Sequence, residues 1–239
     1  MASSAMLPQG FRSTFLEGLT TSEIKIILAA ARQEQISPRQ VLQQEGDPAS
    51  RLCLLVTGRV AAYRLAQDGC RLFFGWGVPG DTFGLVTIVR ELPPYLVTIE
   101  AVQEGSILTW RRASCQALAV QYPNLSRGMN SVVTQYLDHV MDVLAARSFQ
   151  TADERLMRIL LKSARQIGRM GPEGIALDLT NEQLAEAAQV SLFTASRQLS
   201  EWEDRGILKK SRGKILLRAP HHFVGQQFGA SDPKSSETP

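Results

Sequence analysis

Two helix-start signals stand close together near the C-terminal end of this chain, and they constrain its fold more than any other feature. Thr180-Asn-Glu-Gln183 is a capping box, in which the first and last side chains bond each other's backbone amides. Ser191 can cap a second helix that runs to Trp202. A turn around Gln189-Val190 separates the two helices, and small alanines on the first allow close approach. The spacing therefore predicts two short helices packed across a tight turn, the helix-turn-helix pattern.

A basic β-hairpin is predicted directly after these helices. Apolar Ile207-Leu208 and Ile215-Leu216-Leu217 flank the polar run Lys209-Lys210-Ser211-Arg212-Gly213-Lys214. Residues 197–218 contain seven Lys and Arg side chains against three Asp and Glu. A local positive excess of this kind suits the phosphate backbone of double-stranded DNA. We interpret the hairpin as a wing, although a charge run by itself is usually only a solvated face.

DNA recognition is the function that this combination favours. The second helix of a helix-turn-helix enters the major groove with its N-terminal end first. Arg197 can then bond guanine O6 and N7, which is worth about 1–3 kcal/mol of discrimination, and Phe193 can touch a thymine methyl group. Any one of these side chains could be an ordinary exposed residue. The helix caps, the turn, the arginine and the wing all point to the same DNA-binding motif, which favours the functional interpretation. The predicted DNA-binding residues are Ser191, Leu192, Phe193, Thr194, Ser196, Arg197, Lys209 and Lys214.

Residues 38–113 have a different character, with short β-rich runs separated by turn signals. Asp68-Gly69 is a strong signal for a two-residue hairpin between Val60–Leu65 and Leu72–Trp76. Gly46-Asp47-Pro48 marks a further turn. Strands spaced by roughly 8–12 residues indicate a β-sandwich or barrel and not a βαβ sheet.

Between about Asn124 and Arg147 the apolar spacing becomes helical, with two stripes side by side. One stripe would pack on the β-rich segment, and the other would meet a second copy of the chain. We take the stripe with coiled-coil spacing as the dimerisation seam. It consists of Met129, Val133, Tyr136, Val140 and Val143. Leu137, Met141 and Leu144 form the second stripe. The alternative is a plain helix with both stripes in its own core.

These patterns predict four segments: an N-terminal β-roll sensing domain at 1–120, a dimerisation helix and hinge at 121–150, a winged helix-turn-helix at 151–222 and a disordered tail at 223–239. The hinge lies between Arg147 and Thr151, because Thr151-Ala-Asp-Glu154 is another capping box and opens a new helix. No run of about 18 apolar residues exists and the N-terminus lacks a signal-peptide pattern. We therefore expect a cytoplasmic protein without a membrane partner.

An enzyme is not expected. The chain has three histidines, two of them adjacent near the tail, and they form no credible catalytic triad or metal site. It also lacks a phosphate-binding loop. The three cysteines, Cys53, Cys70 and Cys115, are widely spaced without a CxxC pair, which gives no support to a zinc ribbon or a local cluster motif.

From about residue 14 to 220 the chain resembles the CRP/FNR family, bacterial regulators related to the cyclic-AMP receptor protein and the fumarate-nitrate respiration regulator. The resemblance rests on Glu45-Gly-Asp-Pro-Ala-Ser-Arg-Leu52, Thr57-Gly-Arg-Val60, Pro79-Gly-Asp81 and Val190-Ser191-x-x-Thr194-x-Ser196-Arg197. It implies an α+β chain with a cyclic-nucleotide-binding-type β jelly roll, a long dimerisation helix and a C-terminal winged helix-turn-helix. It also implies a homodimer on a near-palindromic operator, with RNA polymerase as a further partner if the protein activates transcription.

The chain departs from this family at the positions that hold a cyclic nucleotide. The family's Gly-Glu pair for the ribose reads Gly84-Leu85, and its Arg-Ser pair for the phosphate reads Tyr95-Leu96. The helix hydroxyls that contact adenine align with Val140 and Met141. Because an anion needs a cation or a nest of donors, cyclic AMP is an unlikely effector. The iron-sulfur branch uses several N-terminal cysteines, and none precedes Cys53.

The predicted effector pocket is instead apolar and aromatic, and the effector is left open. Its residues are Phe74, Trp76, Leu85, Tyr95, Leu96, Tyr136 and Val140. The alternatives are a filled core without a ligand, a small apolar ligand or a gas-sensing haem, and redox control through Cys70. A haem needs an axial ligand. The candidates are His139, which is a weak one, Tyr95, Tyr136, Met141 and Cys70.

Overall fold

The computed structural model describes residues 7–67, 69–88, 93–147 and 151–219, without the side chains of His139 and residues 142–147. The chain divides into two compact units, Met1–Ser148 and Phe149–Pro239, which we call the N-terminal and C-terminal units and describe separately. The boundary falls inside the predicted hinge. The predicted tail, 223–239, lies outside the described residues. None of the helices in the described ranges is long and apolar enough to cross a membrane.

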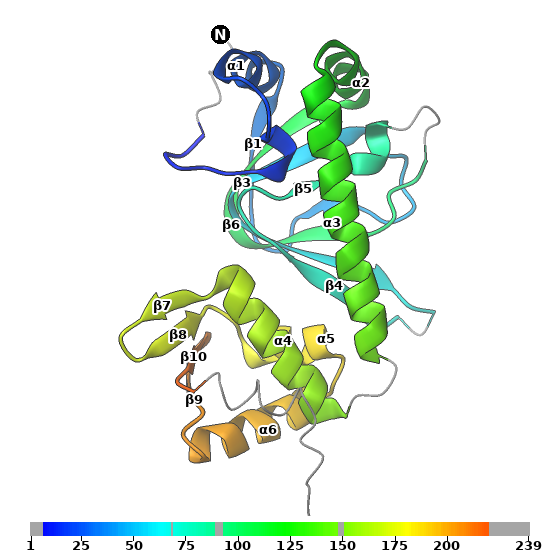
Figure 1. Cartoon of the computed structure of the whole chain (residues 1–239). Coiled ribbons are helices and arrows are strands. Elements are labelled where there is room, and N and C mark those ends of the chain that lie inside the picture. Colours follow the sequence, from blue (N-terminus) through cyan, green and yellow to red (C-terminus); the bar gives the residue numbers. More distant parts are fainter. Residues whose placement is uncertain (1–6, 68, 89–92, 148–150, 220–239) are drawn as a thin grey trace, which may run out of the picture. The chain divides into compact units, whose positions relative to one another are not determined.

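The N-terminal unit is an antiparallel sheet with helices at both ends of its sequence (Figure 1). The strands follow the order β1-β6-β3-β4, while β2 pairs with β6 and β5 with β3. Its elements are the 3₁₀ helices η1 (Thr14–Leu16) and η2 (Leu85–Ile88), the α-helices α1 (Thr21–Ala29), α2 (Arg112–Gln121) and α3 (Pro123–Arg147), and the strands β1 (Arg32–Ile36), β2 (Val41–Gln43), β3 (Arg51–Leu65), β4 (Arg71–Gly77), β5 (Thr82–Phe83) and β6 (Thr98–Arg111).

The longest strands, β3 and β6, bend where two glycines meet. The register between them shifts around Thr57 and Arg59. Gly58 has a φ of +90°, and a Cβ on Gly105 would lie only 2.1 Å from the Thr57 carbonyl oxygen. Only glycine tolerates both this backbone conformation and this closeness. The bulge lets each long strand continue across a bend, so runs that the sequence pattern separates belong to single strands.

The sheet buries an apolar cluster on each face. One cluster holds Cys53, Leu55, Ile99, Ala101 and Ile107 among others, and we call it the interior cluster. The other, the helix-side cluster, joins the sheet to η1, α1, α2 and α3. Its members include Phe15, Ile27, Trp110, Leu125 and Met129. The Trp110 indole donates a hydrogen bond to the Ile27 carbonyl at 2.8 Å, which satisfies its polar edge within this cluster.

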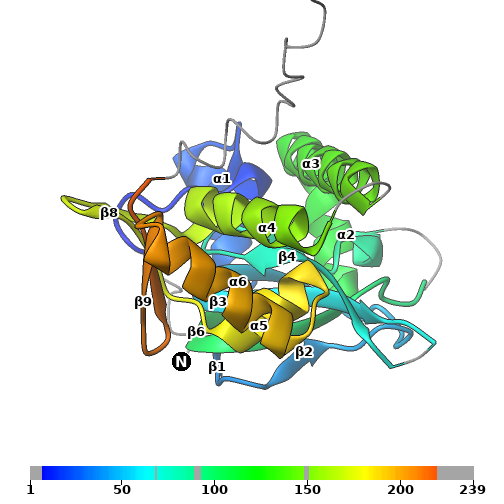
Figure 2. The same ribbon diagram turned by 90° about the horizontal axis from the view of Figure 1, so that it is seen from below.

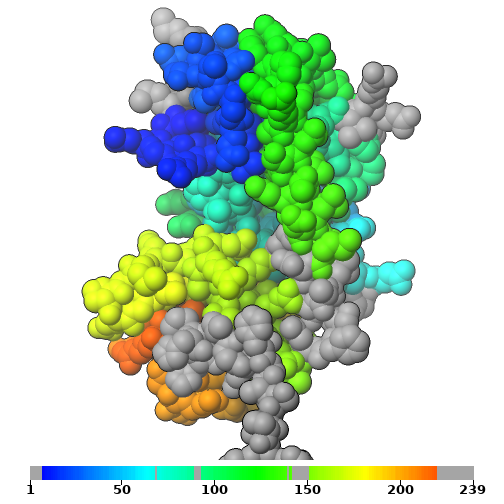
Figure 3. All heavy atoms as spheres, viewed as in Figure 1, coloured from blue at the N-terminus to red at the C-terminus, as the bar shows by residue number. Residues whose placement is uncertain are grey.

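Helix α3 is the predicted 124–147 helix, and its apolar stripes differ from the prediction. Met129 is 1% exposed and packs in the helix-side cluster, so it cannot contact a second copy. Among the described side chains of α3, the large apolar ones that are exposed are Val133, Leu137 and Met141. Figure 3 shows the helix along one side of the N-terminal unit, with an outer face that no other described element covers. Tyr136 and Val140 are half-buried, and the Val143 side chain lies outside the described residues. Apolar spacing identifies stripes but does not say which stripe the rest of the chain covers.

The C-terminal unit combines three helices with a four-stranded antiparallel sheet of order β7-β8-β10-β9. In Figure 2, α5 and α6 lie side by side. The elements are α4 (Ala152–Ile167), β7 (Arg169–Gly171), β8 (Gly174–Leu177), α5 (Asn181–Ala188), α6 (Leu192–Asp204), β9 (Leu208–Ser211) and β10 (Lys214–Leu217). The capping boxes that begin at Thr151 and Thr180 and the Ser191 cap are all present. The short strand β7 occupies a segment without a strand signal and extends the wing sheet.

Candidate DNA-binding surface and effector pocket

The N-terminal turn of α6 presents its side chains to solvent. Ser191 Oγ accepts a hydrogen bond from the Thr194 amide at 3.0 Å, and the two hydroxyls lie 2.8 Å apart. Leu192 is exposed, and Phe193 is 78% exposed. A capped turn with two large apolar side chains in water is a candidate contact surface.

Arg197 extends the same face by one helical turn, because residues i and i+4 lie on one side of a helix. Its side chain is exposed, and its Nε lies 3.9 Å from Glu201 Oε1. Ser196 is half-buried, and Asn181 Nδ2 of α5 donates to its hydroxyl at 3.4 Å. The opposite face of α6 is buried through Ala195, Leu199 and Trp202. Phe193 and Arg197 are therefore available to a groove, while Ser196 also helps to hold α6 against α5.

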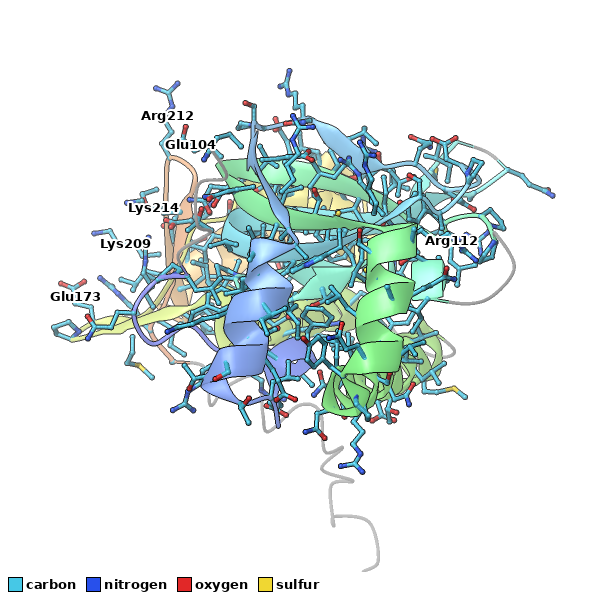
Figure 4. All side chains as sticks on the ribbon, turned by 90° about the horizontal axis from the view of Figure 1, so that it is seen from above. Glu104, Arg112, Glu173, Lys209, Arg212 and Lys214 are labelled. Atoms are coloured by element: carbon cyan, nitrogen blue, oxygen red, sulfur yellow. The ribbon has the colours of Figure 1, made fainter. Side chains whose placement is uncertain are left out.

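The wing is the β9–β10 hairpin, and its basic side chains point outward. Lys209, Arg212 and Lys214 are exposed and extend away from the ribbon (Figure 4). Gly213, at the tip, has a φ of +71° and makes the tight turn. The hairpin thus presents cations at solvent-facing positions, which is what phosphate contacts require.

Lys210, between these cations, is held by α6. Its Nζ donates to Ser200 Oγ at 2.8 Å and lies 3.3 Å from Glu203 Oε2. The Lys210 amide donates to Glu203 Oε1 at 2.7 Å, and this bond holds the pKa of Glu203 below its ordinary value. Glu203 is therefore an ionised anchor between wing and helix, and Lys210 is not one of the outward-facing cations.

Arg155 of α4 holds the turn between α5 and α6, a role that sequence reasoning missed. Its Nε donates to the Ala188 carbonyl at 3.0 Å and its Nη2 to the Gln189 carbonyl at 3.4 Å. Gln189 caps α5 in the left-handed conformation, with a φ of 54°. Carbonyls at a helix C-terminus lack intrahelical partners. Arg155 supplies them from a distant part of the sequence, so no local pattern could have indicated this contact.

In the N-terminal unit, the Tyr95 side chain is engaged with backbone. The Tyr95 hydroxyl donates to the Arg51 carbonyl at 3.0 Å and accepts from the Arg51 amide at 3.1 Å. A Cβ on Gly84 would lie 2.5 Å from that same carbonyl, so the two segments are in close contact. Leu96 is 55% exposed, and the prediction that it lines an enclosed pocket is wrong.

The other predicted pocket residues lie in different surroundings. Phe74 packs against the interior cluster, whereas Leu85 packs against the helix-side cluster. Trp76 is buried, with its ring 4.6 Å from that of Phe73 and the Arg59 guanidinium 5.3 Å from it. Phe74 and Leu85 therefore pack against different clusters, which lie on opposite faces of the sheet.

Tyr136 and Val140 are the half-buried residues of α3 that the prediction placed at the pocket. Burial raises the pKa of the Tyr136 phenol, and the nearby positive charge of Arg64 opposes part of this shift. Arg64 in turn pairs with Glu45 at 2.6 Å. The positive charge of Arg64 near this face of α3 is thus paired with a carboxylate and would have to leave it to bind a phosphate.

Gln43 is a polar residue of β2 that the sequence analysis did not select. Its side chain is buried, and its Nε2 donates to the Val97 carbonyl at 2.9 Å. Among the described residues, its Oε1 has no hydrogen-bond partner, and it would lie 3.4 Å from a Cβ on Gly84. Gln43 stands in the largely polar stretch Gln40–Glu45, so the sequence carried no signal that this side chain is buried. It gives the region around Gly84 an acceptor but no cation.

The described residues offer little to a haem iron. The Tyr95 hydroxyl is occupied, Cys70 and Met141 are exposed, and the His139 side chain lies outside the described part of the chain. Within the described ranges, no group of three His, Cys, Asp or Glu side chains could hold a metal ion. Tyr136 is the remaining candidate ligand with a half-buried side chain.

Two domain families match the two units. Residues 33–122 match the cyclic nucleotide-binding domain, and residues 154–223 match the Crp-like helix-turn-helix domain. Together with the exposed α6 face and its wing, this pairing decides the family. The chain belongs to the CRP/FNR family. CRP/FNR proteins are DNA-binding transcription regulators and not enzymes, and their members bind DNA operators as dimers.

Individual relatives match along most of the chain. A "CRP-like cAMP-activated global transcriptional regulator" of Mycobacterium tuberculosis is 24% identical over 210 residues, covering 86% of this chain and 92% of the relative. The "nitrogen fixation regulation protein FixK" of Azorhizobium caulinodans is 27% identical over 207 residues, covering 79% and 82%. The solved structure of FixK2 from Bradyrhizobium japonicum has a TM-score of 0.71 at 25% identity, covering 82% of this chain and 96% of that one.

Proposed function

We propose that this CRP/FNR regulator is a homodimer that binds a near-palindromic operator and responds to an effector other than cyclic AMP. The observation that carries the DNA-binding part is the exposed face of α6, with Phe193 and Arg197, next to an outward-facing basic wing. Arg197 is the base reader, the wing lysines Lys209 and Lys214 contact phosphates, and the capped turn at Ser191 docks against the DNA backbone.

Dimerisation through α3 would bring two such faces together. Among the described side chains of α3, the large apolar ones that are exposed are Val133, Leu137 and Met141, which recur every fourth residue and form one stripe. Half-sites of a helix-turn-helix dimer lie one DNA turn apart, about 34 Å. Effector binding would shift the population of dimers towards this spacing by moving the units about residues 147–151. The protein would act in the cytoplasm, with RNA polymerase as a further partner if it activates.

The case against cyclic AMP rests on chemistry within the β-roll. At the family's ribose and phosphate positions the chain has Leu85 and the engaged Tyr95. Gln43 adds an acceptor, which a phosphate cannot use. A small neutral molecule or a haem remains a candidate effector, and the exposed Cys70 on the β3–β4 hairpin supports redox control as the alternative.

Arg197→Ala tests the DNA-binding proposal. The probe is the duplex that the wild-type protein selects from a random-sequence library, measured by gel shift. We expect affinity to fall roughly ten- to a hundredfold for each half-site, with the dimer intact by light scattering. Arg205→Ala, at the other end of α6, is the matched control. Wild-type affinity in Arg197→Ala would overturn the proposal.

An absorption spectrum and a titration test the effector proposal. A Soret band in the purified protein assigns haem as the effector group. Calorimetric titration with cyclic AMP is expected to give no heat of binding. Micromolar binding of cyclic AMP that strengthens operator binding would refute the effector part and leave the DNA-binding part standing.

A further inference from the structure

Gln198 is the polar residue on the buried face of the recognition helix α6. Its neighbours on that face, Ala195, Leu199 and Trp202, are apolar or aromatic, and Gln198 itself is only 5% exposed. Burying an amide costs free energy unless its donor and acceptor are satisfied. The partners of this side chain therefore indicate why a glutamine stands among apolar residues.

The Gln198 amide joins two helices. In the orientation that satisfies both its ends, Oε1 accepts from Trp202 Nε1 at 3.1 Å. Its Nε2 donates to Asp153 Oδ1 at 2.8 Å and to Glu201 Oε2 at 3.2 Å. Asp153 lies in the first turn of α4, directly after the segment that links the two units. One side chain thus bridges a carboxylate of α4 and a carboxylate of α6.

Glu201 extends this network to the DNA-reading face. Its other oxygen, Oε1, lies 3.9 Å from Arg197 Nε. An exposed pair of this kind contributes little by itself, because both long side chains are free to choose other rotamers. Here Gln198 bonds the other oxygen of Glu201 from the buried side, which favours the Glu201 rotamer that faces Arg197.

We propose that Gln198 is a positioning residue, which sets the guanidinium of Arg197 through Glu201 and couples it to Asp153 at the hinge end of α4. This inference rests on the proposed role of Arg197 in base reading. A guanidinium restrained before binding loses less conformational freedom when it bonds guanine, so discrimination improves. Because Asp153 adjoins the hinge, a change in the first turn of α4 reaches Arg197 through three side-chain contacts. The amide also separates two carboxylates that would otherwise repel each other.

The test measures discrimination and not affinity alone. Two duplexes are compared by fluorescence anisotropy: the one selected by the wild-type protein, and the same duplex with adenine in place of the guanine that Arg197→Ala ceases to distinguish. The readout is the ratio of the two dissociation constants. A merely structural role would lower affinity for both duplexes and leave this ratio unchanged.

Gln198→Met keeps the volume and removes the amide, and we expect the ratio to fall three- to tenfold. Glu201→Ala, at an exposed position that does not threaten folding, should lower the ratio by a similar factor. The ratio in the double variant should fall no further than in either single variant, because both changes interrupt the same chain of contacts.

Replacing Asp153 tests the α4 end of the network. Asp153→Ala should also lower the ratio, and Asp153→Asn, which keeps an acceptor, should keep it near the wild-type value. Asp204→Ala, an exposed acid of α6, is the control of equal charge.

A wild-type ratio in either Gln198→Met or Glu201→Ala overturns the inference. If Gln198→Met does not fold, Glu201→Ala decides alone. Base reading by Arg197 and the positioning of Arg197 by Gln198 would fail with different results. If Arg197→Ala itself discriminates like the wild type, the proposed function is wrong. If Arg197→Ala loses discrimination while Glu201→Ala keeps it, Arg197 reads the base without this network.

Discussion

The two units of the chain treat their polar side chains in opposite ways. The C-terminal unit presents Arg197, Lys209 and Lys214 to solvent. In the N-terminal unit several polar groups are engaged internally: the Tyr95 hydroxyl bonds the Arg51 backbone, and Arg71 pairs with Glu100 at 3.0 Å. The C-terminal unit thus has exposed cations available to a charged partner, whereas an effector of the N-terminal unit would bind among side chains that already contact one another. The difference indicates that the proposed DNA-contacting side chains are already exposed, whereas an effector in the β-roll would have to compete with hydrogen bonds already made.

The largest expected contrast is between the reactivities of the buried and exposed thiols of the N-terminal unit. It tests whether the sheet interior excludes a reagent in solution. Burial raises the pKa values of Cys53 and Cys115 to about 12, whereas Cys70 is exposed. At pH 8 only about one in 10⁴ of the buried thiols would be ionised. We expect an aromatic disulfide reagent to label Cys70 at least a thousandfold faster, as measured by peptide mass spectrometry. Comparable labelling of Cys53 in the native protein would mean that the sheet interior opens readily.

The bend between β3 and β6 is the next largest effect. In Gly105→Ala the new Cβ would lie 2.1 Å from the Thr57 carbonyl oxygen, a backbone atom that cannot move aside. We expect a loss of about 3 kcal/mol in the unfolding free energy of the N-terminal unit. Urea unfolding followed by tryptophan fluorescence measures it. Gly171→Ala is the control in the other unit, because its Cβ would meet its nearest neighbour at 3.7 Å. Equal midpoints for both variants would contradict the tight crossing.

In the C-terminal unit, replacing the wing lysines should have a smaller effect, which is on DNA affinity. Replacing both Lys209 and Lys214 with alanine should weaken binding about tenfold at physiological salt. The slope of log affinity against log salt should decrease by about 1 for each phosphate that is no longer neutralised. Lys25→Ala, on α1 of the N-terminal unit, removes one positive charge elsewhere and is the control for each single lysine variant. An unchanged slope in the double variant would show that these lysines stay in solvent in the complex.

The smallest effect concerns one strained backbone position in each unit. Among the described residues, Arg39 and Gln189 are the non-glycine residues with positive φ, 70° and 54°. Glycine at either position relieves left-handed strain and should add about 1 kcal/mol to the stability of its own unit. Thermal unfolding of Arg39→Gly and Gln189→Gly measures the gain. A loss in Gln189→Gly alone would mean that its side chain stabilises the turn more than its backbone strains it.

The sequence predicted the C-terminal unit better than the N-terminal one, for a physical reason. Capping boxes at Thr151 and Thr180 are signals within four residues, and one helix carries both Phe193 and Arg197. Whether Met129 or Leu137 faces outward depends on what packs against α3, and spacing alone does not contain that information. A pocket formed by several strands is harder still to predict from sequence, because its residues come from distant segments. Even the adjacent residues Tyr95 and Leu96 differ in exposure, at 5% and 55%. The Asp153–Gln198 contact joins distant segments and has no local signal.

The apolar start of α6 has a thermodynamic consequence. Leu192 and Phe193 leave substantial hydrocarbon surface in water when the protein is off DNA. In the proposed complex, covering that surface in the major groove would release ordered water and give operator binding a negative heat-capacity change. The enthalpy of binding should therefore become more favourable as temperature rises, and calorimetry at several temperatures would follow that slope. The apolar side chains at the N-terminal end of α6 would therefore add a temperature-dependent contribution to operator affinity, in addition to the electrostatic contribution of the basic side chains.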